Sequence, residues 1–122
     1  MNNIPDTILI ENLSHEDGKI EVVFQLNADN SVFKGHFPGQ PVLPGVIQMQ
    51  LIRKVLQQEL AKSLQLLNAP AVKFLSPIVP GPYPTFLLKI SYAEVNSEIH
   101  ADAEIRSGET VFMKLKSKYV QR

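Results

Sequence analysis

The chain has 122 residues, of which 44% are hydrophobic and 20% are charged. This length suits one compact domain, so we expect a single domain over residues 1–122. The 12 basic and 12 acidic side chains give no net charge, which argues against binding to nucleic acid or to an anionic membrane. Because the chain has no cysteine, disulfides and thiolate nucleophiles are excluded. We see neither a membrane-spanning run nor a secretory signal, and expect a cytoplasmic protein.

Two strands are predicted at the start of the chain. Residues Lys19 to Leu26 alternate apolar and polar side chains, which is the period of a half-buried strand. A shorter strand around Thr7 to Leu13 would pair with it as a hairpin, across a turn formed by His15 to Gly18.

A loop and one long helix follow. Between Phe33 and Pro44 lie two glycines and three prolines, a density that excludes a regular helix or a central strand. Residues Val46 to Leu67 contain neither proline nor glycine and predict the only substantial helix. Its apolar positions form two adjacent faces, which indicates a helix wrapped by a sheet along its first half, with looser burial toward its end. The faces are Val46, Met49, Ile52, Leu56, Leu60 and Leu64, and Ile47, Leu51 and Val55.

Four more strands complete the predicted fold. The apolar segment Ala71 to Val79 ends in a stop rich in proline and glycine. Thr85 to Val95 and Glu98 to Arg106 each alternate apolar and polar side chains, and the turn Ser107 to Glu109 leads into Val111 to Tyr119. Two strands, a helix and four strands predict an α+β fold, in which one long helix packs on an antiparallel sheet of five to six strands.

The loop before the helix carries a motif, His-Phe-Pro-Gly-x-Pro-x-x-Pro-Gly-Val. With the order of elements, it resembles the active-site segment of the hot-dog-fold 3-hydroxyacyl-[acyl carrier protein] dehydratases. Phe74 to Gly81 is similar to the next strand of that family and its exit. The resemblance implies a hot-dog fold and a lyase acting on thioesters of acyl carrier protein or coenzyme A in fatty acid, lipid or polyketide synthesis, without a cofactor. The matching residues are His36, Phe37, Pro38, Gly39, Pro41, Pro44, Gly45 and Val46.

The chemistry of this segment agrees with a thioester site. A histidine in a proline-braced loop has few orientations, and its neutral imidazole can accept the proton α to a thioester carbonyl near neutral pH. A backbone N–H near the helix start can stabilise the negative charge that develops on the carbonyl oxygen. The resemblance assigns the base to His36 and the amide to Gly45. We expect Phe37, Pro44, Val46 and Phe74 to line the substrate site as well.

The catalytic carboxylate of the resembled family lies fourteen residues after the histidine and is contributed across a dimer interface. In this chain the position is Gln50, whose amide can hydrogen-bond a hydroxyl or a water but cannot act as an acid. Three functions stay open: a dehydratase, a thioesterase in which Gln50 orients the attacking water, and a non-catalytic acyl-carrier or acyl-chain binding homologue. Gln50 fits equally well in a polar helix stripe with Lys54, Gln57 and Gln58.

The resemblance also implies a homodimer or a higher oligomer of dimers.

Other polar residues of the sequence are assigned no function. His15 lies in a turn and His100 on a polar strand face, and neither has a neighbour at metal-ligand spacing, so no metal site is expected. Three alternating lysines on the last strand are more typical of a solvated strand face than of a docking site for acyl carrier protein. These are Lys114, Lys116 and Lys118.

Overall fold

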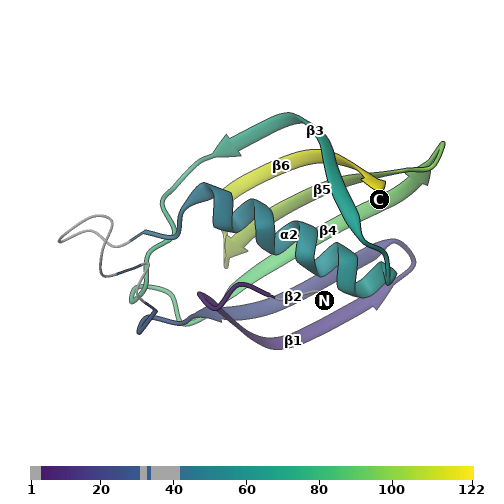
Figure 1. Ribbon diagram of the computed structural model, residues 1–122. Helices are drawn as coiled ribbons and strands as arrows, with labels where there is room; N and C mark the ends of the chain where they lie inside the picture. Colours follow the sequence, from purple (N-terminus) through teal and green to yellow (C-terminus); the bar gives the residue numbers. More distant parts are fainter. Residues whose placement is uncertain (1–3, 31–32, 34–41) are drawn as a thin grey trace.

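The computed structural model describes residues 4–30, 33 and 42–122. The predicted order of two strands, one long helix and four strands is confirmed (Figure 1). The elements are β1 (Ile8–Glu16), β2 (Lys19–Leu26), α2 (Gly45–Leu60), β3 (Leu64–Phe74), β4 (Phe86–Val95), β5 (Glu98–Ser107) and β6 (Thr110–Gln121).

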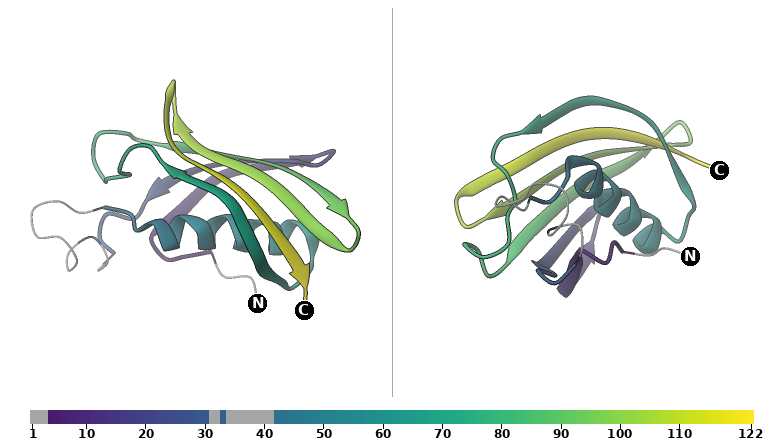
Figure 2. Two further views of the ribbon diagram at one scale, coloured as in Figure 1. Left: turned by 90° about the horizontal axis from the view of Figure 1, so that it is seen from above. Right: turned by 60° about the vertical axis from the view of Figure 1, so that its left-hand side comes forward.

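The six strands form one antiparallel sheet in the order β1-β2-β4-β5-β6-β3, so β1 and β3 are its two edges. Figure 2 shows the sheet curving around α2, which lies along its concave side. One helix held in a curved antiparallel sheet is the hot-dog architecture that the sequence predicts. The sheet therefore has one face packed on the helix and one face exposed to solvent.

Strand alternation builds the core between the sheet and α2. The inward positions of β2, β4 and β5 are apolar, and α2 contributes a cluster of fully buried side chains. Burying such side chains is worth about 1.5–3 kcal/mol each, which holds the helix against the sheet. The buried residues of these elements include Ile20, Val22, Phe24, Phe86, Leu88, Ile90, Ile99, Ile105, Leu51, Ile52, Val55 and Leu56.

One polar pair is buried with this core on β6. The Ser117 hydroxyl donates a hydrogen bond of 2.8 Å to the Tyr119 phenol oxygen. Burial raises the pKa of Tyr119, and the hydrogen bond from Ser117 and the charge of Arg53 lower it to a smaller extent. The Tyr119 phenol therefore stays protonated at neutral pH.

The burial of α2 differs from the prediction at its first turn. Val46, which was assigned to an apolar face, has 63% of its surface exposed, whereas Leu56 and Gln57 near the end of the helix are buried. Burial therefore does not loosen toward the C-terminal half. Within the first turn, Val46 presents apolar surface to solvent, whereas Gln48 is buried.

The helix also ends earlier than the predicted Leu67. It stops at Leu60, because Ala61 adopts a left-handed conformation with φ of 53°. The Lys62 N–H donates to the Gln57 carbonyl oxygen at 3.2 Å, and the Leu64 N–H donates to the Gln57 side-chain oxygen at 2.8 Å. Gln57 thus connects the last turn of α2 to the first residue of β3.

The strand after the helix is correspondingly misplaced in the prediction. Ala71 to Val79 was expected, but β3 spans Leu64–Phe74. As an edge strand β3 is largely exposed on both sides, so its sequence lacks the alternation of the inner strands. Pro70, which has no backbone donor, sits where the register with β6 shifts.

The first hairpin is longer than predicted. β1 spans Ile8–Glu16 rather than Thr7 to Leu13, and the turn consists of Asp17 and Gly18 alone, with φ of 47° and 77°. A two-residue Asp-Gly turn with both φ values positive suits the twist of an antiparallel hairpin. His15 therefore belongs to the strand and not to the turn.

We expect Gln57→Leu to lower the free energy of unfolding by about 1–3 kcal/mol, because it removes a buried acceptor and leaves the Leu64 N–H unpaired. Urea denaturation would measure the change. Gln58→Leu is the matched control, since Gln58 is exposed on the same helix turn and should change stability by less than about 0.5 kcal/mol. Equal effects of the two substitutions would contradict this role.

Candidate active site

The candidate site begins at the N-terminus of α2. Pro44 caps the helix with φ of −58° and ψ of 146°, and no side chain caps its free N–H groups. The N–H groups of Ile47 and Gln48 donate to the Pro44 carbonyl at 3.1 and 3.2 Å. Those of Gly45 and Val46 bond to no other described residue. The first turn has no acidic residue, so within the described residues these two donors stand at the positive end of the helix dipole, where an oxygen atom is stabilised.

Hydrogen bonds fix the approach to this helix start. The Leu43 N–H donates to the Ile78 carbonyl at 2.8 Å, and the Gln48 side-chain Nε2 donates to the Leu43 carbonyl at 3.1 Å. Leu43 is buried and packs with the core. The segment that leads to the N–H groups of Gly45 and Val46 is therefore anchored to Ile78 and to Gln48.

Phe74 covers Gly45 from the end of β3. A Cβ atom built on Gly45 would lie 2.7 Å from Cζ and 3.0 Å from one Cε atom of the Phe74 ring, which is too close for any real side chain. The exposed fractions of Phe74 and Val46 are 52% and 63%. The structure thus brings Phe74 against Gly45, while Pro44 and Val46 flank the glycine. Together they make an apolar surface beside the free N–H groups.

The expected base His36 and the expected lining residue Phe37 lie outside the described residues. Their roles stay predictions. Leu43 and Pro44, which follow the motif's middle section, are described and lead directly into α2.

Gln50 lies on the exposed side of α2, and its side chain makes no hydrogen bond with another described residue. Lys54 and Gln58, one and two turns further along, are partly and fully exposed. Gln57 is buried, so it does not belong to the predicted exposed polar stripe of four residues. Gln50 is free to face a second copy of the chain or a ligand.

The sequence prediction missed Gln48, which is only 3% exposed. Its Nε2 is bonded to Leu43, whereas its Oε1 is buried without a hydrogen-bond partner. The signal was present in the sequence. Gln48 stands four residues before Ile52 and seven before Val55, which places an amide on the apolar face of the helix.

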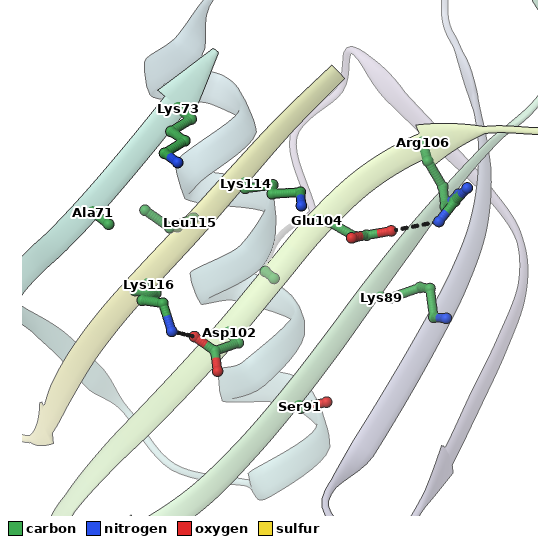
Figure 3. Close-up of a pocket in the computed structure, with 11 residues that line it drawn as sticks. Ala71, Lys73, Lys89, Ser91, Asp102, Glu104, Arg106, Lys114, Leu115 and Lys116 are labelled. Carbon is green, nitrogen blue, oxygen red and sulfur yellow. Dashed lines mark hydrogen bonds and ion pairs between the residues drawn. The ribbon is translucent and has the colours of Figure 1, made fainter. Parts of the chain in front are cut away.

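A hollow on the opposite, outer face of the sheet is lined by charged side chains from β3, β4, β5 and β6 (Figure 3). Lys116 pairs with Asp102 at 3.3 Å, and Arg106 pairs with Glu104 at 3.0 Å. Lys114 is exposed there too, directly opposite Lys73 in the strand register. This charged surface lies on the other side of the sheet from α2 and does not suit an acyl chain.

The two remaining histidines are engaged away from the helix start. His15 lies between Glu59, with Nδ1 and Oε1 3.1 Å apart, and Tyr92, with Nε2 and the hydroxyl 2.6 Å apart. It thereby joins β1, α2 and β4 near the C-terminal end of α2. His100 contacts Glu98 at 2.8 Å. In the described ranges, no group of three or more histidine and acidic side chains could hold a metal ion.

Comparisons with known proteins identify the family of the chain. A model of the ApeI-like family, described as ApeI dehydratase, matches residues 12–113. The ApeI:P dehydratase heterocomplex from Xenorhabdus doucetiae superposes with a TM-score of 0.77 at 26% identity, covering 93% of this chain and 97% of that chain. None of the helices in the part that the structure describes is long and apolar enough to cross a membrane.

Two curated relatives are both 3-hydroxyacyl-[acyl-carrier-protein] dehydratases FabZ. The protein from Acidiphilium cryptum is 31% identical over 68 residues, which cover 48% of this chain and 41% of the relative. The protein from Sulfurovum sp. is 25% identical over 126 residues, covering 82% of this chain and 85% of the relative. The chain thus spans less than half of the Acidiphilium relative and most of the Sulfurovum one.

We expect Gly45→Ala to displace the Phe74 ring, and the two positions to be energetically coupled by about 0.5–3 kcal/mol. In a Phe74→Ala background the same substitution should cost less or even stabilise, because alanine favours a helix over glycine by up to about 1 kcal/mol. Urea denaturation of the four proteins in this double-mutant cycle measures the coupling. Additive effects would show that the ring does not constrain Gly45.

Proposed function

Because the chain belongs to the ApeI-like dehydratase family, we propose that it removes water from 3-hydroxyacyl thioesters carried by acyl carrier protein or coenzyme A. The observation that carries this proposal is the pair of N–H groups of Gly45 and Val46, which bond to no other described residue and lie at the helix start where the Phe74 ring contacts Gly45. A thioester carbonyl oxygen needs such donors when charge develops on it. The acyl chain needs the neighbouring apolar surface.

In the proposed reaction, His36 takes the proton from C2 of the substrate, and the electron pair moves into the carbonyl to give an enolate. The Gly45 N–H, which has no other partner among the described residues, donates to that oxygen. The C3–O bond then breaks as the C2–C3 double bond forms. The departing hydroxyl takes the proton back from the His36 imidazolium, directly or relayed through a water held by Gln50, and leaves as water, which returns His36 to its neutral form.

Gln50 is the reason to keep a second candidate function. An exposed amide cannot supply the proton of a general acid, and losing such help typically costs about 10²- to 10⁴-fold in rate. This favours a homologue that binds acyl thioesters without dehydrating them, working beside an active partner. The ApeI:P protein is described as a heterocomplex. Hydrolysis of the thioester, the other alternative, is separated by the assay below.

We also propose that two copies join at β3, so that each site uses residues of both. Of the nine exposed large hydrophobic residues described, five lie in β3 or directly after it: Leu66, Leu67, Val72, Phe74 and Leu75. An apolar edge strand of this kind is covered in most stable proteins. Since Pro70 offers no backbone donor, the hydrogen-bond ladder between the two copies would form on either side of it.

A single domain over residues 1–122 and a cytoplasmic location stay predictions.

We expect the purified protein to convert 3-hydroxyacyl-coenzyme A into the 2-enoyl product, and His36→Ala to lower the rate by at least about 10²-fold. Absorbance of the enoyl thioester follows dehydration, and a thiol reagent follows hydrolysis. Release of free thiol in place of enoyl product would identify a thioesterase.

In the same assay, Gln50→Glu tests the missing acid. If the native protein is a slow dehydratase, this substitution should raise the rate by about 10-fold or more, because a carboxyl can protonate the leaving hydroxyl. Dehydration that appears only in Gln50→Glu would identify the native protein as a binder. Full activity in His36→Ala would contradict the assignment of the base.

We expect Leu67→Lys to weaken the dimer by at least about 10-fold, because it places a charge in the proposed apolar seam. Sedimentation velocity over a range of concentrations would show the shift to monomer. Leu9→Lys is a matched control, since Leu9 and Leu67 are both 48% exposed but lie on opposite edges of the sheet. Equal effects of both substitutions, or none from Leu67→Lys, would place the interface elsewhere.

A further inference from the structure

The buried side-chain amide of Gln48 uses its NH2 group in a hydrogen bond but not its oxygen. Its Nε2 donates to the Leu43 carbonyl at 3.1 Å, and its Oε1 has no partner in the described part of the chain. The orientation of the amide follows from Leu43, because the reversed amide would set two acceptor oxygens against each other. Leaving a buried acceptor unpaired costs about 1–3 kcal/mol. A cost of this size in the first turn of α2 needs an explanation.

The position of the amide connects it to the helix start. Side chains on a helix lean toward its N-terminus, and Gln48 reaches back to Leu43, two residues before Gly45. Along the axis, the Gln48 backbone is only about 4.5 Å beyond that of Gly45. The same end of α2 therefore offers two donors, from Gly45 and Val46, and one acceptor, from Gln48, that bond to no other described residue.

We propose that the Gln48 Oε1 accepts a hydrogen bond from the 3-hydroxyl group of the bound substrate, which makes Gln48 a specificity-determining residue. This inference rests on the proposed function. A 3-hydroxyacyl thioester carries an acceptor at C1 and a donor at C3, about 2.5 Å apart along the carbon chain. The saturated acyl thioester and the enoyl product both lack the donor. Gln48 thereby favours the substrate over its product and over unsubstituted acyl chains.

Calorimetric titration with octanoyl-coenzyme A and 3-hydroxyoctanoyl-coenzyme A tests this proposal. The titrations use the full chain carrying His36→Ala, so that the hydroxy ligand is not consumed. With Gln48 present, the hydroxy ligand should bind about 3- to 10-fold more tightly. Gln48→Met should bring this ratio to about 1, whatever the absolute affinity of the variant for the two ligands.

A second variant and a control keep the test independent of stability. Gln48→Asn retains an amide but withdraws it by one methylene, and should lose the same preference. Among the described residues, the Thr7 hydroxyl is the other buried side-chain oxygen without a partner, and it precedes β1 at the edge opposite β3. Thr7→Val removes this hydroxyl and should leave the ratio unchanged. Because the ratio compares two ligands on one folded protein, a lower Tm does not alter it.

Three outcomes would overturn the proposal. If the protein with native Gln48 binds the two ligands equally, this inference is wrong, whereas the proposed function is not affected. A preference that survives in Gln48→Met shows that a group other than Gln48 contacts the hydroxyl. If the folded protein binds neither thioester, the proposed function fails, and the inference fails with it.

Discussion

The contact between the Phe74 ring and Gly45 is the constraint on which the site depends. Phe74 ends β3, an edge of the sheet, and Gly45 begins α2 with an unbonded N–H. Because the ring lies where a Cβ atom would be, a larger residue at position 45 would have to displace the Phe74 ring. The proposed dimer edge and the proposed thioester site therefore share one pair of residues, and a change at the edge reaches the site directly.

Two glutamines of α2 show how burial alone fails to separate structure from function. Gln48 is 3% exposed and Gln57 is 4% exposed. The Gln57 oxygen accepts from the Leu64 N–H and from Arg53, and so ends the helix and starts β3. The Gln48 oxygen accepts from nothing that is described. Counting hydrogen-bond partners, rather than exposed area, marks the second amide as available for a ligand.

The inner strands could be predicted from the sequence because each has one solvent-exposed face and one buried face, as β2 shows over Lys19–Leu26. The segment after Leu60 could not. It contains no proline or glycine until Pro70, and the left-handed Ala61 that ends the helix has no sequence signal. The motif identified Gly45 and its surroundings, but the closeness of Phe74 and the free oxygen of Gln48 depend on packing between distant segments, which only the fold reveals.

The irregularity of β1 has a consequence for the size of the assembly. A sheet with two regular open edges could recruit a further copy on each side, and the chains would then grow into a fibre. In β1 the register shifts between Ile10 and Asn12, and such a bulge bends an edge away from a new partner. In the proposed dimer, two-fold pairing occupies the β3 edge of both copies, and only the two β1 edges are left open. A bulge in each of these edges would keep the particle finite, where a flat strand would allow a polymer.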